Sequence, residues 1–436
     1  MNAARGVELV RGCRPGASRQ TVKAAQVSGG RAHRRRGFAA ATISLVAVFA
    51  ASGSPIPLYE RYRVADHLST ADLSLAAVVY FVGAIGALLV LGRLSDHLGR
   101  RPMAIAAVGL AAAGALVLLD VGSLAPLLVG RFLHGVACGL ASTALTSYVV
   151  DTAPPRPCWL PAATTAGAPL AGLTIGALSA GILVQYGPHR LQLTYLLVIA
   201  FLAVCAGLLI GSPETVARRG GARASLRPRV AIPARVRPLM PAAAVVFVST
   251  WALGGFYQAF SPTVSAQALG TSSTLVAAVV FASFMAPNAI GGPLTGRLPA
   301  ATAQRLGMLV FAAAIIVVVV SLHAGSTLGV IAASLVAGAA QGAAFTGTMR
   351  GLLNRTHASE RAGLLAAVYA ISYSGAAIPG LIAGRAAAHL GLVQVAAGYA
   401  ALALAAAVAV VVLTTASGAP EGAPPGHPSP PSPPLA

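Results

Sequence analysis

The strongest constraint on this sequence is the recurrence of apolar runs long enough to cross a lipid bilayer. A helix rises about 1.5 Å per residue, so about 20 apolar residues span the ~30 Å hydrocarbon core. We therefore predict an all-α membrane protein with twelve transmembrane helices. They are expected at residues 38–59, 72–92, 103–124, 126–150, 161–186, 191–211, 239–260, 274–296, 305–323, 327–349, 362–386 and 392–414.

Charged residues are too few to cover a soluble protein of this size. They make up 9% of the 436 residues, and the mean hydropathy is +0.78, whereas about a quarter of the residues in ordinary soluble domains are charged. The formal net charge of +20 does not indicate nucleic-acid binding. The charges lie between the apolar runs, and few aromatic residues are interleaved with them.

The apolar runs form two groups of six. We predict an N-terminal six-helix bundle (38–211), a basic linker (212–238) and a C-terminal six-helix bundle (239–414), in an arrangement that suggests duplication. A basic N-tail (1–37) precedes them, and a Pro-rich tail (415–436) that is expected to be disordered follows. A signal peptide is the alternative interpretation of the first run, but the charged lead before it is too long and a spanning helix is favoured.

Lysine and arginine lie mainly on one side of the predicted membrane. With both termini inside, the inner segments hold 25 of the 30 Lys and Arg residues and the outer segments hold four, while Arg131 lies within a span. Cytoplasmic loops favour cations. We therefore expect a multi-pass protein of the cell (inner) membrane with both termini in the cytoplasm.

Cysteine and lysine usage argues against a metal site or an ATP site. The four cysteines form no CxxC pair, and the single lysine, Lys23, lies in the N-tail. A zinc site and a GxxxxGK[ST] phosphate loop are therefore not expected. We predict no metal and no cofactor, so that energy for pumping must come from another source.

The stretch GRLSDHLGRRP (92–102) concentrates charge between two apolar runs. Anchoring of the topology explains its arginines but does not require Asp96 or the glycines. The stretch resembles the loop between spans 2 and 3 of the major facilitator superfamily, G-x-L-x-D-r-x-G-r-r/k. The matching positions are Gly92, Leu94, Asp96, Gly99, Arg100 and Arg101.

The resemblance implies a fold of two six-helix bundles and a conformational latch. In the family, this loop forms a charge cluster with neighbouring helix ends that holds the outward-open state. We predict that Asp96 and Asp151 form one cytoplasmic latch with Arg100 and Arg101, supported by Gly92 and Gly99.

Other segments carry the same resemblance. SPIPLY (54–59), SPET (212–215) and RFLHG (131–135) are similar to family motifs, although His134 stands where glutamine is usual. The second-half copy of the loop, GRLPAATAQR (296–305), has Ala300 in place of the aspartate.

Arg131 is the clearest charge within a predicted span. A charge at the bilayer centre costs roughly 2.5–3.5 kcal/mol on insertion scales and usually faces the bundle interior. His134 lies three residues on, hence on the same helix face, and histidine titrates near neutral pH. Arg131 and His134 are our candidate coupling residues. The alternatives are an arginine that snorkels to the surface and a packing histidine.

Polar side chains within the spans are candidates for a substrate cavity. No Asp or Glu lies in the middle of a predicted span, which argues against a dedicated cationic substrate. Tyr257, Gln258 and Asn288 are the preferred candidates, because the resemblance places spans 7 and 8 at the cavity. The other candidates are Tyr80, Gln341, Tyr369 and Tyr373, and interhelical packing is the alternative for each.

These observations favour a secondary transporter that moves a small organic solute by alternating access. Proton coupling and export are favoured, the former on the resemblance alone. The alternatives are an uptake permease for a neutral or anionic metabolite and a polytopic membrane enzyme. We predict that the chain is not an enzyme, because a cluster of catalytic residues at one membrane face is missing. We also expect a monomer in the lipid bilayer that binds a small-molecule substrate and uses protons as the coupling ion.

Overall fold

The computed structural model describes residues 31–157, 159–188, 190–228, 230–357 and 359–416. In this part of the chain all regular elements are helical, and twelve helices are long and apolar enough to cross a membrane. The predicted fold class is therefore confirmed. Most of the two predicted tails, at residues 1–30 and 417–436, lies outside the described residues.

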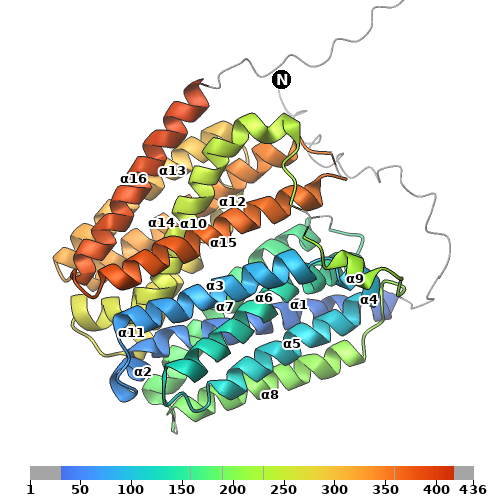
Figure 1. Ribbon diagram of the computed structural model, residues 1–436, viewed down its shortest axis with the longest axis horizontal. Helices are drawn as coiled ribbons and strands as arrows, with labels where there is room; N and C mark the ends of the chain where they lie inside the picture. The colour runs from blue at the N-terminus through green and yellow to red at the C-terminus, as the bar shows by residue number, and fades with distance from the viewer. Residues whose placement is uncertain (1–30, 158, 189, 229, 358, 417–436) are drawn as a thin grey trace, which may run out of the picture.

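The spans form two bundles that lie side by side (Figure 1). The first bundle contains α1 (Arg31–Gly53), η2 (Ile56–Leu58), α2 (Tyr59–Ala65), α3 (Thr70–Leu91), α4 (Ser95–Leu98), α5 (Arg100–Val117), α6 (Leu124–Thr152), α7 (Leu160–Tyr186) and α8 (Arg190–Ile210). The connector carries α9 (Ala222–Ser225) and η3 (Ala234–Leu239). The second bundle contains α10 (Met240–Thr263), η4 (Val264–Ala268), α11 (Thr274–Met285), α12 (Asn288–Leu294), α13 (Ala300–His323), α14 (Thr327–Leu353), α15 (Arg361–Ala386) and α16 (Leu392–Ala416).

The spans run between two ends of the molecule, the linker end and the opposite end. The linker end carries the connector with α9, the short helix α4 and the start of α1; in Figure 1 it lies at the right. The opposite end carries α2, the start of α11 and the turn between α15 and α16. Successive spans alternate in direction between these two ends.

The first span is longer than predicted at both ends. Helix α1 begins at Arg31, so the arginines of HRRR (33–36) form its first turns instead of belonging to the tail. Arg34 donates to the carbonyl of Ala153 at the end of α6 (3.3 Å), which ties these turns to the bundle. At the other end the prolines of SPIP interrupt the helix at η2, and α2 continues to Ala65.

The eighth span is broken, although the sequence predicts one continuous run at 274–296. Helix α11 ends at Met285 and α12 begins at Asn288. Pro287 lies between them; proline has no N–H for the helical hydrogen bond and clashes with the preceding turn. Asn288 is therefore the first residue of a new helical segment.

Glycine pairs set the closest helix contacts in both bundles. A Cβ on Gly135 or Gly139 of α6 would overlap carbonyl oxygens of α3. In the second bundle a Cβ on Gly338 or Gly342 of α14 would overlap the carbonyl oxygens of Phe284 and Asn288. Small residues allow such close backbone approach. The same pairing of spans in each half agrees with the duplication suggested by the sequence.

Candidate functional site

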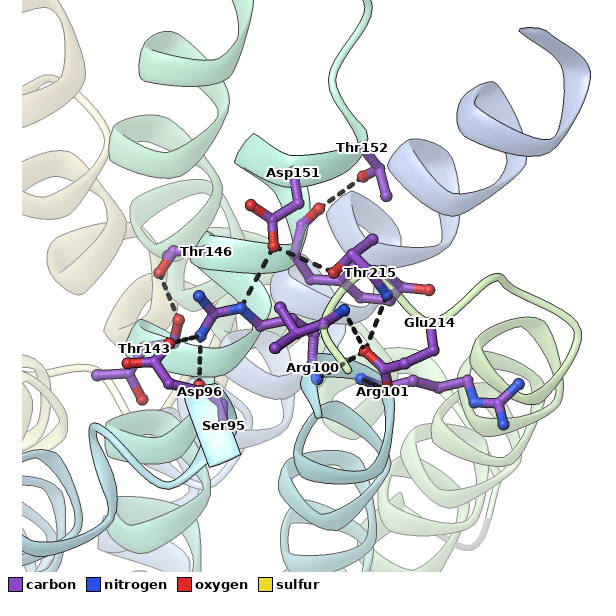
Figure 2. A network of polar contacts seen from close by, with 12 residues as sticks. Ser95, Asp96, Arg100, Arg101, Thr143, Thr146, Asp151, Thr152, Glu214 and Thr215 are labelled. Carbon is purple, nitrogen blue, oxygen red and sulfur yellow. Dashed lines mark hydrogen bonds and ion pairs between the residues drawn. The ribbon is translucent and has the colours of Figure 1, made fainter. Parts of the chain in front are cut away.

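Arg100 is the centre of the charge cluster at the linker end (Figure 2). It lies in the first turn of α5 and is only 15% exposed. Its Nη1 pairs with Asp96 Oδ1 (2.6 Å) and donates to Ser95 Oγ (2.6 Å), and its Nε pairs with Asp151 Oδ2 (3.3 Å). Thr215 also donates to Asp151 Oδ2 (3.1 Å). Arg100 therefore brings together the two predicted carboxylates from α4 and α6.

Arg101 does not contact either carboxylate, contrary to the predicted set. Its Nη1 donates to the carbonyls of Ile210 (3.3 Å), the last residue of α8, and Ser212 (3.2 Å), just beyond it. Figure 2 shows its guanidinium pointing away from Asp96 and Asp151. Neighbouring helical residues point about 100° apart, so two consecutive arginines cannot both face the same carboxylates.

Glu214 was not predicted as a site residue, although it lies in the SPET segment. Its carboxylate accepts from the backbone N–H groups of Arg100 (2.9 Å) and Arg101 (3.1 Å), and also from two N–H groups of its own loop. Helix N-termini carry unpaired N–H groups and favour anions. Gly99 has a φ of +104°, and a Cβ there would lie 2.6 Å from Glu214 Oε2. Gly99 is thus required both by its backbone conformation and by the capping carboxylate.

The charge cluster around Arg100 lies within the first bundle and the segment that follows it. Gly92 ends α3, and a Cβ there would lie 3.3 Å from Thr143 of α6. All described partners of the Arg100 and Arg101 side chains belong to α4, α6, the last residue of α8 or the segment after it. In this conformation the predicted latch therefore joins helices of the first bundle and does not cross to the second.

The second-half copy of the loop is built differently. Ala300 stands where the first copy has the aspartate. In this second copy the arginine comes from α14: Arg350 donates to the carbonyls of Thr295 (3.1 Å) and Gly296 (3.0 Å). Backbone carbonyls thus take the place of the missing carboxylate.

Arg131 is fully buried between the two bundles. Its Nη1 donates to the carbonyl of Ser52 in α1 (2.8 Å), and its Nη2 donates to Gln258 Oε1 in α10 (3.2 Å). The guanidinium lies over the Tyr80 ring (4.6 Å to the centroid) and near the Tyr59 ring (5.9 Å). Within the described residues no carboxylate pairs with Arg131, and its Nε makes no hydrogen bond.

His134 is also fully buried but faces a different neighbour. A Cβ on Gly114 of α5 would lie 2.6 Å from the His134 ring, so this glycine makes room for it. The ring lies beside the Ala111 carbonyl, without a well-formed hydrogen bond at either nitrogen. Arg131 and His134 are thus near neighbours without a hydrogen bond between them in the described structure.

The remaining cavity candidates fall into separate groups. Tyr257 is buried inside the second bundle, where its hydroxyl bonds Ser334 Oγ (2.5 Å) and its ring stacks on Phe284 (4.3 Å). Gln341 is buried, and its Oε1 has no hydrogen-bond partner among the described residues. Asn288 is half-buried at the start of α12.

Aromatic side chains from both bundles meet between α3, α10 and α15. Tyr373 lies 6.1 Å from Phe81, 4.8 Å from Trp251 and 6.3 Å from Tyr369, and Phe81 lies 5.2 Å from Tyr80 (centroid distances). Tyr80, Phe81 and Tyr373 are buried, whereas Trp251 and Tyr369 are half-buried. These five rings are called the aromatic group below. The structure thus brings the predicted residues Tyr80, Tyr369 and Tyr373 together. Tyr80 also contacts Arg131.

Hydrogen bonds between the bundles gather near the opposite end. Besides Arg131–Gln258, Ser74 of α3 donates to the Gly380 carbonyl of α15 (2.6 Å), and Thr274 of α11 donates to the Gly181 carbonyl of α7 (3.2 Å). Among the described residues, these inter-bundle bonds lie within roughly 12 Å of the helix ends. The two bundles are therefore closed against each other at the opposite end.

Two bundles of six membrane-spanning helices, closed at one end over a buried polar and aromatic interface, define the class of two-bundle membrane transporters. The Major Facilitator Superfamily profile matches residues 38–322, well over half of the chain. The chain belongs to this family.

One solved structure shows how far the likeness extends. The chain is similar to the crystal structure of a mutant of the nucleoside transporter NupG, with 13% identity and a TM-score of 0.65. The match covers 86% of this chain and 99% of NupG. Because the sequence identity is low, the likeness shows the fold alone. No curated protein matches the sequence.

Proposed function

We propose that this protein is a secondary transporter that exports a small organic solute in exchange for protons, by alternating access. Membership of the family supports secondary transport. The observation that carries the mechanism is the closure of the two bundles at the opposite end by hydrogen bonds between them, of which Arg131–Gln258 is fully buried. Rocking of the bundles breaks these bonds and opens that end, while the linker end closes.

The proposed orientation places the linker end in the cytoplasm. Arginines dominate this end, and cations favour cytoplasmic loops. The closed end then faces outward. In this state the cluster around Arg100 holds the first bundle together and is free to contact the second bundle when the linker end closes.

His134 is the proposed proton carrier. It is the histidine buried within the described spans, and it lies one helical turn from Arg131. A proton on His134 would place two cations close together, so protonation opposes the closed arrangement around Arg131. His134→Gln should abolish the pH dependence of transport, and His323→Gln, at an exposed histidine of α13, is the control.

Locking the closed end tests alternating access directly. Ser273 Oγ lies 3.3 Å from Gln185 Oε1 across the bundle interface. In a chain without native cysteines, a short, reducible bifunctional thiol reagent should join the Gln185→Cys, Ser273→Cys pair and stop transport, and a reductant should restore transport. Each single cysteine variant is the control. Undiminished transport by the crosslinked protein contradicts the rocking mechanism.

The direction of transport is tested in cells and in vesicles. Expression in an efflux-deficient bacterial host should confer resistance to some members of a panel of toxic compounds, and Arg100→Gln should remove it at equal membrane levels. Uptake of a neutral or anionic metabolite is the second candidate, because the buried Arg131 has no carboxylate partner in the described structure and would pair with an anionic solute once the bundles part. Proton-driven accumulation in right-side-out vesicles, with no resistance in cells, would favour uptake.

A further inference from the structure

The buried guanidinium of Arg131 has no carboxylate partner among the described residues. A buried cation is normally paired or fully hydrogen-bonded. In the part of the chain that the structure describes, the guanidinium donates to a neutral amide and a backbone carbonyl and interacts with the uncharged Tyr59 side chain, and its Nε has no hydrogen-bond partner. The Nε and Nη2 atoms lie on the same edge of the guanidinium, and this edge is the one that grips a carboxylate with two parallel hydrogen bonds.

The acceptor that occupies this edge among the described residues, Gln258 Oε1, moves away when the bundles part. Gln258 belongs to α10, whereas Arg131 and its carbonyl partner Ser52 belong to the first bundle. Rocking that opens the opposite end therefore withdraws Gln258 Oε1 and exposes both Nε and Nη2. The exposed edge needs a new acceptor, and a carboxylate satisfies both its charge and its geometry.

The surroundings of this edge are aromatic. The Tyr80 ring lies against the guanidinium (4.6 Å), and Tyr80 leads through Phe81 to Tyr373. These rings come from both bundles, so their faces also part when the bundles rock. Flat aromatic molecules stack well on such faces, and pairs of rings favour offset or edge-to-face contact.

Resting on the proposed function, we infer that the transported solute is a small aromatic carboxylate. Its carboxylate takes the place of the Gln258 amide on Arg131 Nε and Nη2, and its ring lies against the aromatic group. Gln258 thus acts as an internal stand-in for the substrate in the empty, closed protein. Aromatic cations are excluded, because the nearest charge is positive.

Direct binding to the purified full-length protein in nanodiscs tests this inference. The probe is radiolabelled benzoate, with anthranilate and indole-3-acetate as further aromatic carboxylates. The competitors separate the two halves of the inference: benzamide lacks the charge, cyclohexanecarboxylate lacks the aromatic ring, and 1-methyl-4-phenylpyridinium reverses the charge. We expect at least one aromatic carboxylate to bind tenfold or more tightly than all three.

Variants assign the binding to the named atoms. Arg131→Lys keeps a cation but loses the two-pronged edge, and should weaken binding about tenfold or more. Gln258→Leu removes the internal competitor and should preserve or strengthen binding. Tyr373→Leu should weaken it, whereas Tyr399→Leu, at a buried tyrosine of α16 that packs on Phe256, should not. Arg131→Lys guards against misfolding of a neutral variant.

Each result has one meaning. Equal binding of cyclohexanecarboxylate overturns the aromatic part, and equal binding of benzamide or the pyridinium overturns the carboxylate part. Absence of binding by all three aromatic carboxylates, in a protein whose Gln185–Ser273 cysteine pair still crosslinks reversibly and controls transport of another solute, overturns the substrate class and leaves alternating access intact. Transport that continues in the crosslinked protein overturns the proposed function itself.

Discussion

Single residues carry the inter-bundle closure. Arg131 and Gln258 come from helices 127 residues apart in the sequence, yet they form a buried hydrogen bond. The sequence identifies Arg131 as a charge within a span and Gln258 as a polar residue within a span. Their pairing could not be predicted, because it depends on how the two bundles face each other.

Loss of the Gln258 side chain should open the opposite end. Hydrogen bonds to charged groups contribute about 1.5–3 kcal/mol, so Gln258→Leu should raise the population of the open state by about tenfold or more. The measurement is the rate at which a cysteine at Gln185 reacts with a membrane-impermeant maleimide in intact cells. Gln341→Leu is the matched control, because its Oε1 makes no hydrogen bond. An unchanged rate in Gln258→Leu would contradict this role.

Glu214 caps a helix from a distant part of the chain. The charge pattern of 92–102 draws attention to Asp96 and the arginines, but the capping carboxylate comes from 114 residues further on. Glu214→Gln should lower the unfolding temperature by several degrees, since helix caps and N-terminal charges together contribute about 1–2 kcal/mol. Glu360→Gln, which removes the charge from a carboxylate that accepts from one N–H group, should have a smaller effect. Thermal unfolding in detergent distinguishes the two variants.

At the scale of helices, the sequence predicts well which spans exist but poorly where a span is broken. All twelve spans are found because an apolar run of about 20 residues has few other stable fates in a membrane. The breaks at η2 and at Pro287 are not found, because hydropathy does not register a missing backbone N–H group. The different directions of Arg100 and Arg101, about 100° apart, follow from helix geometry once the start of α5 is known.

The contact between α12 and α14 should be sensitive to one added methyl group. A Cβ on Gly342 would overlap the Asn288 carbonyl, so Gly342→Ala must push these helices apart. We expect a loss of stability of roughly 1–3 kcal/mol, the usual cost of overpacking. Gly109→Ala is the control, because no atom lies within 4 Å of its added Cβ. The unfolding temperature should fall in the first variant and stay level or rise in the second.

For the whole molecule, the two bundles and the family could be predicted from the sequence, and the conformational state could not. Closure at the opposite end rests on contacts such as Ser74 with Gly380, whose partners lie in different bundles. In the proposed mechanism such contacts change as the bundles rock, so a single pattern in the sequence does not encode one conformational state. The site around Arg131 was recovered only as separate candidate residues for the same reason.

The orientation of the whole molecule is open to a labelling test. Ala217 is exposed at the linker end and Leu390 is exposed at the opposite end. In a chain without native cysteines, Leu390→Cys should react with an impermeant reagent in intact cells, whereas Ala217→Cys should react only in inverted vesicles. The reversed pattern would contradict the placement of the arginine-rich end in the cytoplasm.

In the proposed cycle, the guanidinium of Arg131, which has no carboxylate partner among the described residues, also makes transport sensitive to voltage. With the site empty, the positive charge is uncompensated, and each rearrangement that exposes it to one side and then the other shifts charge through part of the electric field. A bound carboxylate cancels that charge, so the loaded rearrangement is nearly silent electrically. One elementary charge crossing the full field is worth about 2.3 kcal/mol per 100 mV. In the proposed exchange for protons, the carrier returns without a carboxylate on Arg131, so the resting potential acts on that return step and sets how fast a polarised cell can cycle the protein.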